Sequence, residues 1–116
     1  MVTAEQLAET LRARSANQRV RADARAERLR MLLPKARQIL VERYLASRVV
    51  LFGSLATGGH SERSDVDLAV LGMPSDHYFH ALADLMALFG GPVDLVRIEE
   101  ALPSLRACIE EEGRVL

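Results

Sequence analysis

The chain has little of several residue types, and each shortage narrows the classes of protein to which it can belong. Its single cysteine, Cys108, cannot form an internal disulfide and lies in a helical pattern typical of a small apolar residue. It has no apolar run of about 18 residues and no signal-peptide pattern, so we expect a cytoplasmic protein without a membrane partner. Aromatic residues make up 4% of the chain and are absent from its basic N-terminal arm, which argues against a nucleic-acid partner.

What the chain does have is an uneven distribution of charge. Residues 1–48 carry eleven of the fifteen Lys and Arg and five of the sixteen Asp and Glu, a net charge of +6. Residues 49–116 carry the other four basic and eleven acidic residues, a net charge of −7. A basic arm joined to an acidic body is typical of a chain that docks on an acidic surface or packs against its own or a second acidic body.

Apolar spacing predicts a basic helical extension over residues 1–33 and one domain over residues 34–116. The extension begins at a capping box formed by Thr3 and Gln6. Its apolar stripe is thin, which leaves two interpretations. The first is an arm that binds a partner or nucleic acid, including a homodimer through this helix. The second is a solvated helix laid on the domain, or an extension whose arginines only confer solubility. Pro34 is expected in the first turn of a second helix, where its missing N–H costs nothing.

The body alternates strands and helices, which predicts an α+β fold with a small mixed β-sheet and helices packed against it. Strands are expected at residues 48–52, 65–71 and 93–98, with a short strand at the C-terminus. Helices are expected over residues 76–89 and from residue 103 to about residue 113. The buried stripe of the first of these two helices is expected to contain Phe79, Leu82, Leu85, Met86 and Phe89.

Two aspartates at the start of the second strand form the first candidate site. Because side chains alternate across a strand, Asp65 and Asp67 leave one face while the apolar residues beside them leave the other. Two carboxylates so placed repel unless a cation lies between them, and Mg²⁺ binds through carboxylates and a substrate's phosphates. The alternative interpretation is turn chemistry, in which these residues only close the loop before the strand.

Two further features favour a metal and phosphate site. Gly53 and Ser54 end the first strand where a helical turn begins, and such a turn offers backbone N–H groups and a hydroxyl to a phosphate. Asp94 lies inside the third strand between two apolar residues, where a carboxylate is costly to bury without a cation or strong hydrogen bonds. Asp65, Asp67 and Asp94 are therefore the candidate metal ligands and catalytic residues.

The spacing of these residues resembles the signature of the nucleotidyltransferase superfamily that includes DNA polymerase beta: Gly53-Ser54, ten residues, then Asp65-Val66-Asp67. The short chain is most similar to the minimal nucleotidyltransferases, which are often paired with HEPN-domain proteins in prokaryotic toxin–antitoxin modules. The resemblance implies the nucleotidyltransferase fold, with the Gly-Ser pair on the triphosphate, the two aspartates on metal and Asp94 as the third carboxylate. If two Mg²⁺ ions are held, they would clamp both oxygens of an in-line displacement.

The same resemblance implies transfer of a nucleoside monophosphate, most simply AMP from ATP or its counterpart from another nucleoside triphosphate, onto a hydroxyl of a HEPN partner. The chain would then act as an antitoxin. Thr57 departs from the family pattern, which has a basic residue at this position of the loop. Arg63 and His60 are candidates to bind phosphate in its place, although both also fit a solvated loop. The departure leaves a second hypothesis open: a weak or inactive nucleotidyltransferase-fold module that neutralises its partner by contact.

Overall fold

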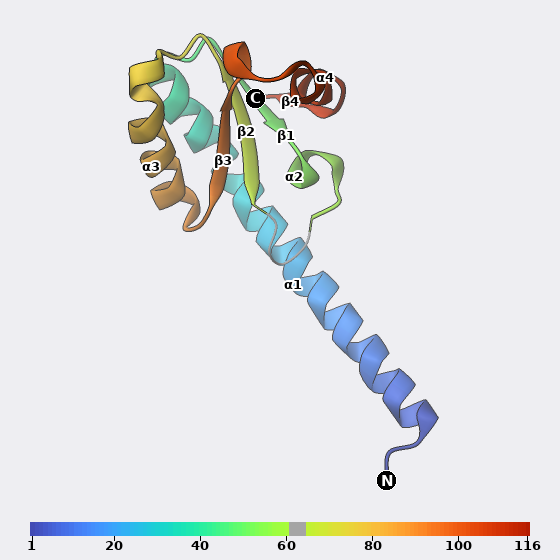
Figure 1. Ribbon diagram of the computed structural model, residues 1–116. Coiled ribbons are helices and arrows are strands. Elements are labelled where there is room, and N and C mark those ends of the chain that lie inside the picture. The colour runs from blue at the N-terminus through green and yellow to red at the C-terminus, as the bar shows by residue number, and fades with distance from the viewer. Residues whose placement is uncertain (61–64) are drawn as a thin grey trace.

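The N-terminal helix is the most extended part of the molecule. The computed structural model describes residues 1–60 and 65–116 and measures 62 × 29 × 19 Å along its principal axes. Helix α1 (Ala4–Gln38) continues into the π-helical turn η1 (Ile39–Arg43), and its first half projects from the body (Figure 1). Over the parts of the chain that the structure describes, neither α1 nor any other helix combines the length and apolar character needed to cross a bilayer.

Helix α1 passes through Pro34 without a break, so the prediction that a second helix begins there is wrong. The capping box is confirmed, because Thr3 and Gln6 exchange both of its hydrogen bonds at the start of α1. A proline inside a helix removes one backbone hydrogen bond and usually kinks or ends it. Here Leu33 and Ala36 on either side of Pro34 are buried in the body, and this packing outweighs the local preference.

Four strands form one mixed sheet, as the sequence predicts. They are β1 (Arg48–Phe52), β2 (Val66–Leu71), β3 (Val93–Arg97) and β4 (Arg114–Val115), in the spatial order β3-β2-β1-β4. Strand β1 is antiparallel to both β2 and β4, whereas β2 and β3 are parallel. The predicted α+β class and the nucleotidyltransferase-like mixed sheet are therefore confirmed.

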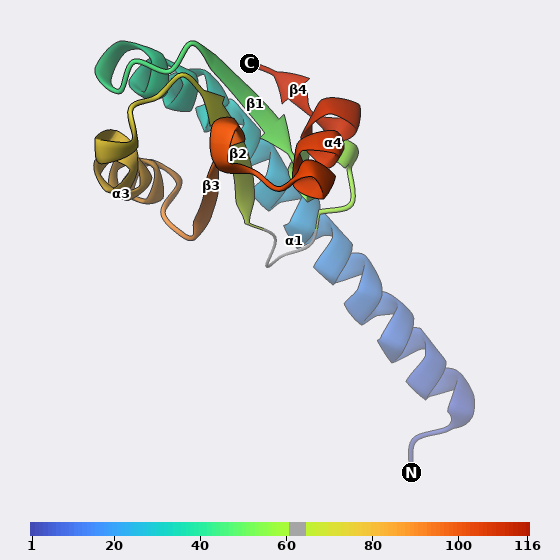
Figure 2. The ribbon, with the colours of Figure 1, turned by 45° about the horizontal axis from the view of Figure 1, so that its top comes forward.

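Helices cover the two faces of the sheet unequally. One face is covered by the inner half of α1 and by helix α3 (Tyr78–Phe89), which follows the 3₁₀ turn η2 (Ser75–His77) (Figures 1 and 2). Part of the other face is covered by helix α4 (Pro103–Glu112), which follows the 3₁₀ turn η3 (Ile98–Glu100). Strand residues alternate accordingly, with Leu51 and Leu68 in the larger core below α1 and α3. The smaller core beneath α4 consists of Val50, Phe52, Ala69 and Ile109.

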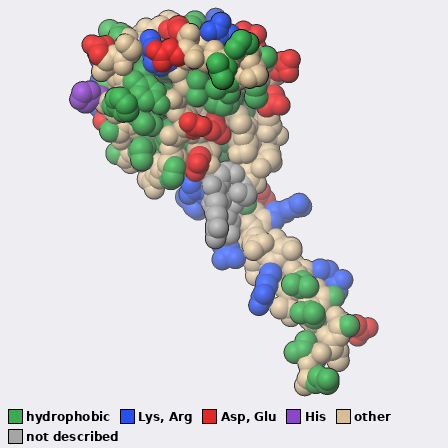
Figure 3. All heavy atoms as spheres, viewed as in Figure 1, with side chains coloured by type: hydrophobic (Ala, Val, Ile, Leu, Met, Phe, Trp, Pro, Cys, Tyr) green, Lys and Arg blue, Asp and Glu red, His purple; other side chains and the backbone are tan. Residues whose placement is uncertain are grey.

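Part of the buried stripe predicted for α3 is wrong. Phe79 is 78% exposed and Met86 43% exposed, while the residues of α3 that are buried are Ala81, Leu85 and Phe89. The apolar face of α3 is wider than the sheet edge that it covers, so residues at its margin remain in solvent. Figure 3 shows apolar side chains gathered on the α3 side of the body.

Candidate active site

Strand register brings two of the three predicted carboxylates together. Asp67 of β2 is paired with Asp94 of β3 on one side and with Phe52 of β1 on the other. Paired residues of neighbouring strands point to the same face, so Asp67 and Asp94 leave the α4 face of the sheet together with Phe52. Asp65 lies exposed immediately before β2, two positions from Asp67. Asp94 is exposed as well, so the expectation that a carboxylate is buried in β3 is wrong. Asp67 and Asp94 thus lie side by side where β2 and β3 begin, next to the end of β1.

The charges of these carboxylates act on one another. Burial is the largest cause that raises the pKa of Asp67 above its ordinary value, and the carboxylates of Asp94 and Asp65 raise it further. The charge of Asp94 also contributes, after burial, to the raised pKa of the Tyr78 hydroxyl, which donates a hydrogen bond to the carbonyl oxygen of Leu95 at 2.7 Å. Tyr78 itself is partly buried and packs against the edge of the larger core.

The chemistry of these side chains fits a divalent metal. Within residues 1–60 and 65–116, no three Asp, Glu, His or Cys side chains converge closely enough to ligate one ion. Asp65, Asp67 and Asp94 nevertheless lie close enough together to affect the protonation of Asp67. All three offer the carboxylate oxygens that Mg²⁺ prefers, and a cation among them would offset the repulsion that adds to burial in raising the pKa of Asp67.

Gly53 packs its backbone against the carboxylate of Asp67. Its φ of +72° and ψ of −158° lie in a region that is almost restricted to glycine. A Cβ at this position would overlap the Asp67 carboxyl group, with Cγ only 2.9 Å away. The four-residue helix α2 (Ser54–Thr57) begins at the next residue, and the first N–H groups of a helix have no partner within it. We call residues 53–60, which adjoin the carboxylates, the phosphate loop.

Thr57, which stands where the family has a basic residue, and the two residues considered as replacements have different surroundings. Thr57 is exposed, and its Oγ1 donates to the Gly53 carbonyl at 3.2 Å. Arg63 lies outside the residues that the structure describes. His60 is not a solvated loop residue, because its side chain is only 13% exposed and its Nε2 lies 2.9 Å from Oδ1 of Asp23 in α1.

Sequence reasoning missed the contribution of α1 to this region. Besides the contact between Asp23 and His60, the Nη2 of Arg30 donates to the carbonyl oxygen of Leu55 in α2 at 3.3 Å. These contacts join residues 37 and 25 positions apart. Such distant pairs leave no local periodicity, and no signal in one sequence could have identified them.

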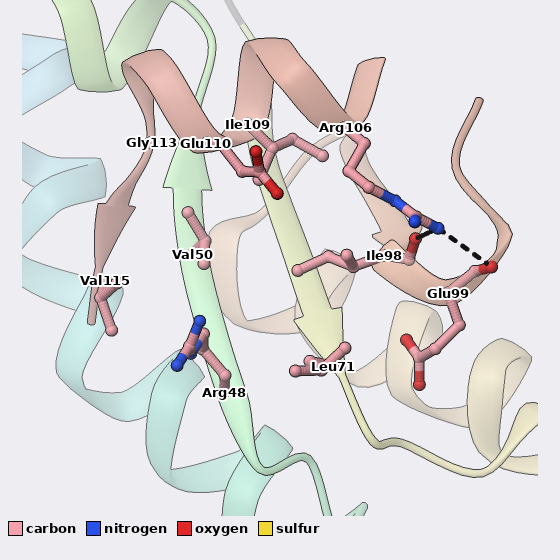
Figure 4. A pocket seen from close by; sticks show the side chains of 10 residues that line it. All are labelled: Arg48, Val50, Leu71, Ile98, Glu99, Arg106, Ile109, Glu110, Gly113 and Val115. Carbon is pink, nitrogen blue, oxygen red and sulfur yellow. Dashed lines mark hydrogen bonds between the residues drawn. The ribbon is translucent and has the colours of Figure 1, made fainter. Parts of the chain in front are cut away.

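A groove of about 480 Å³ lies on the same face of the sheet but at the opposite end. Its floor includes Val50, Leu71 and Val115, and Arg48 and Glu110 lie at its rim (Figure 4). Since Arg48 and Leu71 are the first residue of β1 and the last residue of β2, the groove lies away from the carboxylates. It is a separate feature of the surface and has no part in the candidate active site.

Comparison with known proteins agrees with this fold. Residues 35–116 match the family described as polymerase beta nucleotidyltransferase. A candidate protein adenylyltransferase of Methanocaldococcus jannaschii is 36% identical over 86 residues, which span 70% of this chain and 87% of the relative. The chain therefore belongs to the polymerase beta-like nucleotidyltransferase family and is a transferase enzyme.

Solved structures of two similar proteins share the fold. The structure of a candidate minimal nucleotidyltransferase superposes with a TM-score of 0.64 and 32% sequence identity, covering 76% of this chain and 95% of the other. A mutant of the toxin–antitoxin MntA-HepT superposes with a TM-score of 0.63 and 25% identity, covering 72% of this chain and 69% of the other. Proteins similar to this chain in structure thus include a candidate minimal nucleotidyltransferase and a member of a toxin–antitoxin complex.

Proposed function

We propose that this nucleotidyltransferase acts in the cytoplasm as an antitoxin that transfers AMP from ATP onto a hydroxyl of a HEPN-family partner, with Mg²⁺ as its metal. The observation that carries the proposal is the pairing of Asp67 with Asp94 beside the backbone of Gly53. It supports the proposal because it brings two candidate metal ligands next to a loop whose first backbone N–H groups could bind phosphate, and nucleotidyl transfer requires both. The proposed domain division, with an extension over residues 1–33 and the nucleotidyltransferase domain over residues 34–116, is supported by the extent of the family match.

The residues of the site have distinct roles in this proposal. Asp65, Asp67 and Asp94 would hold two Mg²⁺ ions, which when bound neutralise the charge that develops on the phosphates. The partner's hydroxyl oxygen attacks the α-phosphorus, the bond to the β-phosphate oxygen breaks, and pyrophosphate leaves. Asp94 accepts the proton of the attacking hydroxyl. Gly53, Ser54 and Arg63 bind the terminal phosphates.

A second candidate function is a binding module with little or no catalytic activity. Thr57 favours it, because an exposed threonine cannot neutralise phosphate charge. The projecting part of α1 offers a binding surface, since Leu7, Leu11 and Val20 are each more than half exposed there. A HEPN partner or a second copy of the chain could bury these side chains, so this proposal includes a homodimer through α1.

Mass spectrometry distinguishes the two functions. The protein is incubated with Mg²⁺ and ATP, with and without the product of the adjacent gene, and the masses of both proteins are measured. We expect the partner to gain the mass of one or more AMP groups only when ATP and Mg²⁺ are both present. A tight complex whose partner gains no mass would select the binding module instead.

Introducing a basic side chain at position 57 should increase the affinity for ATP. We expect Thr57→Arg to lower the KM for ATP about tenfold, because a charge-assisted hydrogen bond to a phosphate is stronger than a neutral one. The exposed position leaves room for the longer side chain. Thr57→Gln, which adds length without charge, is the control. An equal effect of the two substitutions in steady-state kinetics would contradict a role for charge at this position.

A further inference from the structure

Helix α1 contacts both halves of the phosphate loop. Near the start of the loop, Arg30 donates from Nη2 to the Leu55 carbonyl oxygen at 3.3 Å. At its end, Nε2 of His60 lies 2.9 Å from Oδ1 of Asp23. These are the described side-chain bonds that reach the loop from another element, and both come from a helix that lies almost wholly before the family match at residues 35–116.

The two contacts come from one face of α1. Asp23 and Arg30 are seven residues apart, which is about two helical turns, so their side chains leave the helix on the same side. Ala26 lies between them and is buried in the body, so this face cannot rotate away from the loop. His60 is largely buried while its partner Asp23 is 65% exposed, so the loop histidine is packed down against the helix. The inner half of α1 and the phosphate loop are therefore held as one unit.

From these contacts we infer that α1 is part of the nucleotide site and that Asp23 and Arg30 are positioning residues for the phosphate loop. The inference rests on the proposed function, since the loop is taken to bind the terminal phosphates of ATP. A loop that binds phosphate chiefly through backbone N–H groups works only if those groups already point at the ligand. Because Thr57 supplies no charge to the loop, correct placement of its backbone accounts for a larger share of phosphate binding.

The first test needs no nucleotide. The N–H groups of Thr57 and Gly58 donate within the loop to the carbonyl oxygens of Gly53 and Ser54, so their hydrogen exchange reports opening of the loop. We expect Arg30→Gln and Asp23→Asn to speed exchange at these two amides about fivefold, as loss of one hydrogen bond predicts. The matched controls are Arg14→Gln and Glu9→Gln, which alter exposed charges of the projecting part of α1. Exchange as slow as in the controls overturns the inference.

The second test measures nucleotide binding and turnover in the full chain. We expect Arg30→Gln and Asp23→Asn to raise the KM for ATP about fivefold with little change in kcat, because the loop binds phosphate alike in the ground and transition states. Arg30→Lys keeps a donor and should restore most of the affinity, which a loss of general stability would not allow. In a double-mutant cycle, adding Asp23→Asn to His60→Ala should not raise the KM for ATP any further.

The two tests separate this inference from the proposed function. If the unaltered chain binds no ATP by calorimetry, the proposed function fails, and the exchange experiment alone decides whether α1 holds the loop. If the unaltered chain binds ATP but the variants match their controls in KM, α1 has no part in the nucleotide site and the inference is wrong.

Discussion

Replacing Asp67 with Asn is expected to reduce nucleotidyl transfer by about 10²- to 10³-fold while making the ligand-free fold more stable. Asparagine keeps the shape of the side chain but removes the negative charge that a divalent metal requires. The same charge is unfavourable in the fold, because burial and the carboxylates of Asp94 and Asp65 raise the pKa of Asp67. Loss of activity together with a gain in stability is the expected behaviour of a residue kept for function.

The gain in stability should depend on pH. Because the pKa of Asp67 is higher in the folded chain than in the unfolded one, protonation favours the fold. This contribution is fully present below the unfolded pKa of about 4 and is lost as the pH rises through the higher folded value. Thermal unfolding of Asp67→Asn and the unaltered chain should therefore coincide at low pH, and the variant should unfold at a higher temperature at neutral pH.

Asp84→Asn is the matched control for this experiment. The hydrogen bond from Tyr44 is the largest cause that lowers the pKa of Asp84, and the hydrogen bond from Arg43 lowers it further. The negative charge of Asp84 therefore stabilises the fold above the unfolded pKa. The substitution should lower the unfolding temperature at neutral pH and leave transfer unchanged. Mg²⁺ with ATP should raise the unfolding temperature of the unaltered chain but not that of Asp67→Asn. If Asp67→Asn transfers label from α-labelled ATP as well as the unaltered chain does, Asp67 is not part of the active site.

Local patterns predict most of the elements that build the site. A continuous apolar run locates β1, and alternation of apolar residues locates β2 and β3. This alternation correctly separates the face of Asp67 from that of Leu68. The pairing of Asp67 with Asp94 is different, because it depends on which residues of β2 and β3 lie side by side. Strand register is set by packing over the whole sheet, so the sequence indicates this pairing only through its resemblance to known sequences.

Elements shaped by contacts far along the chain are not visible in the sequence. Pro34 is a strong local signal for a helix start, but burial of Leu33 and Ala36 carries α1 straight through it. Helical spacing in α3 identifies apolar positions such as Phe79 without saying how much of the helix surface the sheet can cover. The position of α1 beside the phosphate loop is of the same kind, because it follows from packing and not from any motif.

Replacing Gly53 with Ala is expected to have the second large effect, because it disturbs the backbone and Asp67 together. The φ of +72° with ψ of −158° costs an alanine about 1–3 kcal/mol. The new Cβ would also meet the Asp67 carboxyl group, which must rotate away from the place where it faces Asp94. We therefore expect a destabilised fold whose transfer activity is reduced about a hundredfold even well below its unfolding temperature.

Gly90→Ala separates the two causes. Gly90 has nearly the same φ, +71°, at the C-terminal end of α3, but a Cβ there has no neighbour among the described residues within 4 Å. It should cost about 1 kcal/mol in unfolding free energy, measured by urea titration, and leave transfer unchanged. If Gly53→Ala lowers activity no more than Gly90→Ala at equal fractions of folded protein, the close approach of this backbone to Asp67 does not matter for catalysis. A selective loss at position 53 would show that the loop backbone and the metal-binding carboxylate are positioned by direct contact.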